Sequence, residues 1–323
     1  MISKNSVIFT KMDKKDYFIN INPYRKKGIF NPHYKGDSNS FFYDFNLEKC
    51  RKFHKYANTY TILDLSPDGS KIITISNKNI DKTHNNILKI LEIGTNKVLF
   101  ENRDFYTYEA YFTANPKYII CRVKYFNDNY IYVYDIESNK IVHNINDKIF
   151  IQNGCFDGKR SNFLFPSREK DDYSINRLNF ETLSTSKIDV SSIHIFVNSV
   201  KLINNKELLL IEPANKSLYL YYKRKVIWKL ELSELFISEY DGGFFHLDKK
   251  IYFDTPAVNQ NSKNMVLFRI DEDNGSLEHI NLPFGVEYRK FTPMFENKII
   301  DMAGNIIDIR NEKTSLFNIN SFK

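Results

Sequence analysis

IYVYDIESNKIVHNI, residues 131–145, carries the strongest structural signal in this chain. An apolar run ends at Tyr134 and Asp135, a polar turn follows, and a second apolar run completes a predicted β-hairpin. Clear copies read FFYDFNLEKCRKF at residues 41–53 and LKILEIGTNKVLF at residues 88–100. Weaker copies begin at Ile175, Leu218, Leu267 and Ile306. The chain is therefore predicted to contain seven related hairpins.

One residue in each hairpin marks the end of its first strand. These anchors are Asp44, Glu92, Asp135, Asn179, Tyr222, Arg269 and Asp308. From Asp44 to Asp308 their mean spacing is 44 residues over six intervals, and a repeat of this length is typical of β-propeller blades. We expect the acidic anchors Asp44, Glu92, Asp135 and Asp308 to be structural, because a carboxylate at the end of a strand accepts hydrogen bonds from the turn that it opens.

Two more strands precede most of the hairpins. YTILDLS at 60–66 and KIITIS at 71–76 flank the turn Pro67-Asp68-Gly69, and YEAYFTAN at 108–115 and YIICRVKY at 118–125 repeat the order. The sequence thus predicts an all-β fold, a seven-bladed propeller of four-stranded antiparallel blades, with six or eight blades as alternatives. SVIFTKM near the start and SLFNINSF near the end both read as strands, so either is predicted to complete the other's blade.

The whole chain, 1–323, is predicted to be a single propeller domain. The expected blades are 1–56, 57–104, 105–147, 148–190, 191–233, 234–282 and 283–323.

The composition favours a folded chain in the cytoplasm. It has 27 Phe and 21 Tyr among 323 residues, which suit half-buried strands. Its N-terminal region lacks the apolar core of a signal peptide or a membrane span. Three cysteines do not make a disulfide framework. The net charge of +7 modestly favours a partner with an acidic surface.

Residues 57–147 give the chain a resemblance to a known family. YTILDLSPDGSKIITISNKN followed by ILKILEIGTNKVLF resembles a blade of WD-repeat or YVTN-type propellers. The pairs Tyr43-Asp44 and Tyr134-Asp135 stand where such repeats end their third strand with Trp-Asp. The resemblance implies a propeller that most often serves as a protein-binding platform and less often acts on small molecules.

A long basic and aromatic connection is predicted from Ile21 to Ser40. In propellers of this kind, connections between second and third strands share one face with the connections between blades, and long ones build binding surfaces. Further long connections are expected at 77–86, 166–174 and 255–264. The candidate partner-binding residues are Tyr24, Arg25, Lys26, Lys27, Phe30, His33, Tyr34 and Lys35.

The sequence offers no catalytic, cofactor or metal motif. Cys50 and His54 lie four residues apart, which on a strand separates them by about 13 Å. The run from Asp271 to Gly275 lacks the spacing of a calcium loop and is predicted to be a hairpin turn. No G-x-S-x-G elbow and no glycine-rich phosphate loop occur. No catalytic residue, metal or cofactor is therefore predicted.

The preferred function is a non-catalytic module that binds a partner protein through its loop-rich face. One alternative is an enzyme or a small-molecule binder, lactonase-like or specific for a sugar or lactone, that uses the central channel. Another is a binder of phosphate-rich or nucleic-acid ligands through residues 21–40. The mixed charges of the predicted connections favour protein over nucleic acid, and no membrane partner is expected.

Overall fold

A computed structural model describes most of the strands of this chain and part of its connections. The described residues are 17–22, 27–32, 41–44, 46, 49–52, 60–76, 86–125, 128–145, 154–169, 172–188, 190, 197, 199–203, 207–212, 216–232, 244–256, 265–282, 291–301, 304–311 and 313–316. They form seven antiparallel sheets, each made of four strands that are consecutive in the chain. Within these ranges, no helix has the length and apolar character needed to cross a membrane.

The strand bounds follow in chain order. The first two sheets are β1 Tyr17–Asn22, β2 Lys27–Pro32, β3 Phe41–Asp44 and β4 Lys49–Lys52, then β5 Tyr60–Leu65, β6 Lys71–Ser76, β7 Leu88–Glu92 and β8 Val98–Asn102. The next two are β9 Tyr106–Phe112, β10 Tyr118–Tyr125, β11 Asp128–Asp135 and β12 Lys140–Ile145, then β13 Cys155–Phe156, β14 Asn162–Glu169, β15 Asp172–Asn179 and β16 Thr185–Ile188. The last three are β17 Ser199–Ile203, β18 Glu207–Glu212, β19 Ser217–Tyr222 and β20 Lys225–Glu231, then β21 Phe245–Leu247, β22 Lys250–Pro256, β23 Met265–Asp271 and β24 Leu277–His279, then β25 Phe291–Pro293, β26 Lys298–Asp301, β27 Asn305–Asp308 and β28 Lys313–Leu316.

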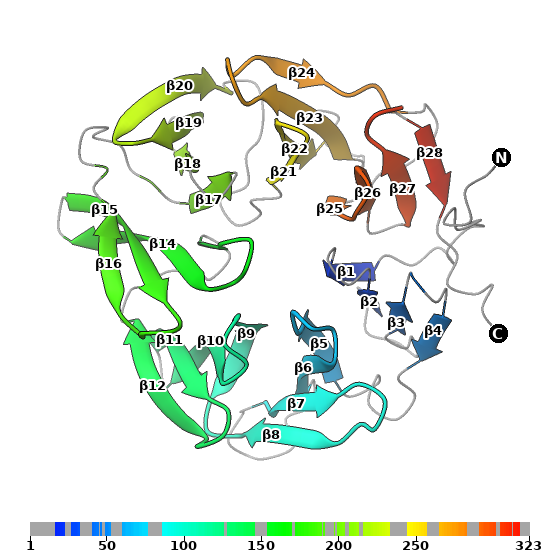
Figure 1. The fold of residues 1–323 in the computed structure, drawn as a ribbon, viewed down its shortest axis with the longest axis vertical. Helices are drawn as coiled ribbons and strands as arrows, with labels where there is room; N and C mark the ends of the chain where they lie inside the picture. The colour runs from blue at the N-terminus through cyan, green and yellow to red at the C-terminus, as the bar shows by residue number, and fades with distance from the viewer. Residues whose placement is uncertain are drawn as a thin grey trace.

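The sheets are arranged as blades around a common axis, as Figure 1 shows. The first strand of each sheet lies nearest the axis and the fourth lies at the rim, so the molecule is a β-propeller. We number the blades 1 to 7 in chain order. Blade 1 meets blade 7 where β1 contacts β25.

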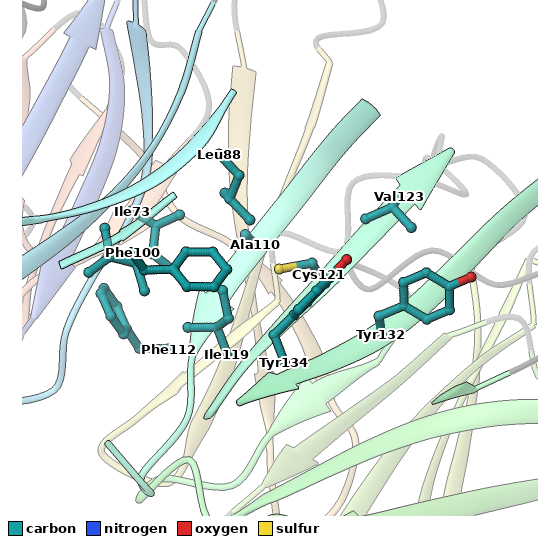
Figure 2. Close-up of a cluster of buried hydrophobic side chains, with 11 residues drawn as sticks. Ile73, Leu88, Phe100, Ala110, Phe112, Ile119, Cys121, Val123, Tyr132 and Tyr134 are labelled. Atoms are coloured by element: carbon teal, nitrogen blue, oxygen red, sulfur yellow. The ribbon is translucent and has the colours of Figure 1, made fainter. Parts of the chain in front are cut away.

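Apolar residues on both faces of each sheet explain how the blades pack. On β10, Ile119 and Cys121 point toward blade 2, whereas Ile120 packs with Phe163 and Phe165 of blade 4. All five side chains are at most 1% exposed. Figure 2 shows the cluster between blades 2 and 3, formed by Ile73, Leu88, Ile90, Phe100, Ala110, Phe112, Ile119, Cys121, Val123, Tyr132 and Tyr134. Since both faces of a blade are buried, its strands read as apolar runs.

Trp228, the single tryptophan of the chain, joins blades 5 and 6. Its side chain is 8% exposed, and its Nε1 donates to the Glu272 carbonyl at 2.9 Å. Gly275 has φ +73°, and a Cβ there would lie 2.9 Å from the indole. Glycine therefore fits both the backbone conformation and the close approach of the ring. Trp228 fluorescence reports on the packing of these two blades.

A buried ion pair connects three consecutive blades. Asp64 of β5, 0% exposed, accepts a hydrogen bond from the Phe112 amide of blade 3 at 2.9 Å. Both carboxylate oxygens of Asp64 also accept from Arg160, which lies in the β13–β14 turn of blade 4. Arg160 donates in addition to the Phe112 carbonyl at 3.2 Å. A register shift in β5 between Ile62 and Asp64 accompanies this arrangement, and bulges of this kind redirect side chains.

Two of the four acidic strand-end anchors, Asp135 and Asp308, are shown in the predicted structural role. The Asp135 carboxylate accepts from the Glu137 and Ser138 amides, both at 3.0 Å. Asp308 accepts from the Arg310 amide in the same way, also at 3.0 Å. The anchor of blade 6 was wrong: Arg269 lies inside β23, paired with Glu278 of β24. The turn is opened by Asp271, which accepts from the amides of Asp273 and Asn274.

Replacing Asp135 tests this role. We expect Asp135→Ala to lower the free energy of unfolding at pH 7 by about 1–2 kcal/mol because two hydrogen bonds are lost. Asp135→Asn keeps an acceptor oxygen and is expected to lose less. The measurement is urea unfolding followed by Trp228 fluorescence, with Glu137→Ala in the same exposed turn as the control. Equal losses for the Asn and Ala variants would contradict this role.

The same variants have an expected pH dependence. The Ser138 amide and the nearby Lys117 ammonium hold the pKa of Asp135 below its ordinary value of 3.8. The stabilisation is therefore fully present above the unfolded-state pKa and is lost as the pH falls below about 4 through the folded-state pKa. Between pH 5 and pH 3 the free energy of unfolding of the native protein should therefore fall by more than that of Asp135→Asn, which lacks the titrating carboxyl.

Two expectations about connections were wrong. The predicted loop from Ile21 to Ser40 contains the end of β1 and all of β2. The predicted connection 166–174 is an extended hairpin, since β14 runs to Glu169 and β15 starts at Asp172. Among the described residues, β1–β4 and β25–β28 each form a four-stranded sheet. SVIFTKM at 6–12 and most of SLFNINSF lie outside the described residues, so a strand exchange between the first and last blades stays a prediction.

Candidate functional site on the upper face of blade 3

The two faces of the propeller follow from the antiparallel strand order. β9 begins at the same end of blade 3 at which β10 passes to β11. We call this end of the ring the upper face, which carries the connections between second and third strands, and the opposite end the lower face. The strands β10 and β11 of blade 3 are each eight residues long and end and begin, respectively, at this upper face.

Two exposed tyrosines lie at the start of β9, next to the axis. Tyr106 is 36% exposed and Tyr108 is 38% exposed. Their ring centroids are 4.9 Å apart with an edge-to-face inclination of 62°. The pairing of β9 with β10 shifts register at this point, where Glu109 faces Arg122 and Thr107 faces Val123. Tyr108 is thus the extra residue of a β-bulge, a feature that is common next to functional sites.

Cationic side chains from β10 accompany the tyrosines. The Arg122 guanidinium lies over the Tyr108 ring, with its Cζ 4.9 Å from the centroid. Arg122 Nη1 is 3.3 Å from Glu109 Oε1, and these two side chains are only 12% and 15% exposed. Lys124 pairs with Tyr106 in the strand register and is exposed. We call Tyr106, Tyr108, Arg122 and Lys124 the tyrosine cluster. It combines an aromatic pair, an arginine whose charge is opposed by Glu109, and one exposed lysine.

A buried amide fixes the backbone between the two tyrosines. Asn86, just before β7 of blade 2, donates from Nδ2 to the Thr107 carbonyl at 2.6 Å and accepts from the Thr107 amide at 2.8 Å. Asn86 is 3% exposed and Thr107 is 1% exposed. Among the described strands β9 pairs with β10 alone, so this amide occupies the other edge of β9 at Thr107. The backbone that carries the two flanking tyrosines is therefore held in place before any partner binds.

Burial controls the ionisation of nearby groups. Burial, reinforced by the carboxylates of Glu109 and Asp64, raises the pKa of Tyr111 above its usual value. Burial raises the pKa of the Cys121 thiol and raises that of Cys155 to about 11. Both thiols are therefore protonated at neutral pH, and a protonated thiol is a poor nucleophile and metal ligand. No group of three metal-ligating side chains lies together among the described residues.

The structure divides the sequence-predicted site residues. Lys27 and Phe30 belong to β2. Tyr24, Arg25, Lys26, His33, Tyr34 and Lys35 lie outside the described residues. Their role in partner binding therefore stays a prediction. Cys50 lies in β4, and His54 is outside the described part of the chain.

The tyrosine cluster was not among the predicted site residues. YEAYFTAN had been assigned to a strand, which is correct for Tyr108–Phe112. The available signal was a Tyr-x-Tyr pair at the start of an inner strand, since both rings project to one side when the spacing is two. Their exposure depends on the packing of blades 2 and 4, which the local sequence does not encode.

Comparisons with known proteins show the fold. No family model and no curated protein sequence matches the chain. The uncharacterized protein lmo1340 from Listeria monocytogenes EGD-e is similar in structure with a TM-score of 0.64 and 13% identity, covering 97% of each chain. Kluyveromyces lactis Hsv2 gives a TM-score of 0.59 at 9% identity over 91% of this chain and 93% of that chain. The β-propeller domain of the Trilobed protease from Pyrococcus furiosus gives 0.56 at 13% identity over 90% and 92%.

Proposed function

We propose that this propeller is a non-catalytic module that binds a partner protein through its upper face. The observation that carries the proposal is the exposed Tyr106–Tyr108 pair beside Arg122. Tyrosine and arginine are enriched among the residues that dominate protein–protein binding energies. An interface rim is typically polar and charged around an aromatic centre. Lys124, which pairs with Tyr106 in the strand register, supplies a charge beside the tyrosines.

The rigidity of the site supports the same function. The Asn86 amide holds Thr107 through two hydrogen bonds, so the tyrosines need little ordering when a partner binds. A preformed site avoids much of the entropy loss of association. The proposal extends to the type of propeller: the Tyr134-Asp135 pair at the end of β11 supports membership of the WD-like or YVTN-type group.

Site-specific photo-crosslinking tests the function. A photoreactive phenylalanine analogue replaces Tyr108 in the full chain, and a second protein carries it at Val226, which is 40% exposed on the outer strand β20. We expect discrete protein adducts from position 108 in cells and none of the same adducts from position 226. Mass spectrometry identifies the adduct, and calorimetry with the purified partner should show direct binding. Absence of adducts at position 108, or equal labelling at both positions, would refute the proposal.

A further inference from the structure

We infer that the tyrosine cluster binds an extended acidic segment of the partner protein, with an aliphatic or proline side chain against the Tyr106–Tyr108 pair and a carboxylate near Lys124. This inference rests on the proposed function and adds the chemistry of the bound segment. It follows from the spacing of the two rings, from the capped edge of β9 and from the local charge.

The spacing of the rings favours an extended ligand. Tyr106 and Tyr108 are two residues apart on one strand, a separation of about 7 Å along the chain. Alternate side chains of an extended peptide have the same spacing, so one residue contacts the rings while its second neighbour lies further along β9. The other exposed large hydrophobic side chains of the described residues are aliphatic and lie on the outer strands β8, β12 and β20. The exposed aromatic surface in these ranges is thus concentrated at this cluster.

The edge of β9 excludes one common mode of peptide binding. Peptides often add a strand to an open sheet edge through main-chain hydrogen bonds. At Thr107 those groups already bond to Asn86, at 2.6 and 2.8 Å. At Phe112 the amide bonds to Asp64, and the carbonyl accepts from Arg160. Strand addition is therefore blocked at Thr107 and at Phe112, which favours a contact through side chains, and the tyrosine rings are the side chains offered.

The local charge favours a carboxylate over a phosphate backbone. Arg122 is opposed by Glu109 at 3.3 Å, which leaves Lys124 as the exposed cation of the cluster. One exposed cation complements one acidic side chain, whereas a nucleic-acid track neutralises several phosphates. The edge-to-face inclination of 62° also leaves the tyrosines without the parallel ring faces on which successive bases stack.

Peptide selection on the full chain tests this inference. The probe is a phage-displayed library of random unstructured 16-residue peptides, with removal of phage that bind a Tyr106→Ala/Tyr108→Ala protein. We expect enriched peptides to carry Pro or an aliphatic residue within a few positions of Asp or Glu. The double variant should weaken binding of a selected peptide by about tenfold or more. Val226→Ala, which changes a residue of similar exposure on β20, should leave the affinity unchanged.

Charge reversal supplies the second arm. Lys124→Glu should weaken binding of the acidic peptide by several-fold, and a peptide with Lys in place of its acidic residue should recover the loss. Normal urea unfolding of each variant excludes misfolding as the cause. The inference is overturned if no acidic peptide is selected, or if a labelled 15-nucleotide poly(dT) binds instead with steep salt dependence. If crosslinking identifies a partner whose affinity is insensitive to these variants, the function stands and this inference fails.

Discussion

Arg160→Ala is expected to lower the free energy of unfolding by about 3 kcal/mol, because it leaves the Asp64 carboxylate buried without its guanidinium partner. Asp64 is 0% exposed, and the Arg160 side chain is 28% exposed. The variant also removes the hydrogen bond from Arg160 to the Phe112 carbonyl. The pair spans 96 residues and joins blades 2, 3 and 4, so its loss should weaken the ring at two interfaces at once.

Urea unfolding at pH 7, followed by Trp228 fluorescence and by far-ultraviolet circular dichroism, measures this effect. Arg103→Ala is the matched control, since the Arg103 side chain is 53% exposed and its Nη2 lies 2.6 Å from Glu101 Oε1. An exposed pair of this kind is worth about 1 kcal/mol or less. Arg160→Lys keeps a positive charge without the forked geometry and should recover part of the loss. If Arg160→Ala and Arg103→Ala unfold at the same urea concentration, the buried pair does not hold the blades together.

The sequence predicted the features that depend on neighbouring residues. The turn at Pro67-Asp68-Gly69 is an example: the Ser66 amide donates to the Lys71 carbonyl at 2.9 Å, and Gly69 has φ +69°. The carboxylate at Asp135 accepts from amides two and three residues away. Such contacts depend on local residue order, so a repeat of local patterns predicts a propeller of four-stranded blades.

Polar strands were missed for a physical reason. β2 reads KGIFNP, with only Ile29 and Phe30 apolar, and the hairpin around residues 166–174 reads PSREKDDYS. Hydrophobic patterning identifies a strand only where its residues are apolar. Backbone pairing defines these strands instead: β2 pairs with both β1 and β3, and residues 166–169 pair with residues 172–175. Even the buried Ser167 and Ser174 give no apolar signal. The prediction of one long connection over residues 21–40 was wrong for this reason.

The candidate site depends on contacts that no local pattern contains. Asn86 reaches Thr107 across 21 residues, and Asp64 reaches Arg160 across 96. Tyr106 and Tyr108 belong to the tyrosine-rich strand β9, and the tyrosine-rich strand β19 is almost wholly buried, yet these two tyrosines are exposed. Whether an aromatic side chain on an inner strand is exposed depends on how the blades are assembled, so the structure was needed to find the tyrosine cluster.

Gly154→Ala is expected to destabilise the protein by about 3 kcal/mol, at the upper end for overpacking of a core. A Cβ at this position would lie 2.4 Å from the Leu164 carbonyl oxygen and 2.5 Å from the Phe163 ring. Phe163 is 0% exposed within the core between blades 3 and 4, so its ring has little room to move. The Leu164 oxygen belongs to the backbone of β14, which pairs with Cys155 directly after the glycine. Relief therefore requires a displacement of β13 from β14.

The displacement should also reach blade 5, because Lys201 Nζ donates to the Gly154 carbonyl at 3.2 Å. Gly158→Ala is the matched control in the same blade: Gly158 is exposed in the turn, and its φ is not positive. We expect the free energy of unfolding of Gly158→Ala to stay within about 0.5 kcal/mol of the native value. If Gly154→Ala is as stable as Gly158→Ala, the close packing of β13 on Phe163 does not constrain the fold. If only the former is destabilised, the glycine is required because β13 approaches β14 too closely for any side chain.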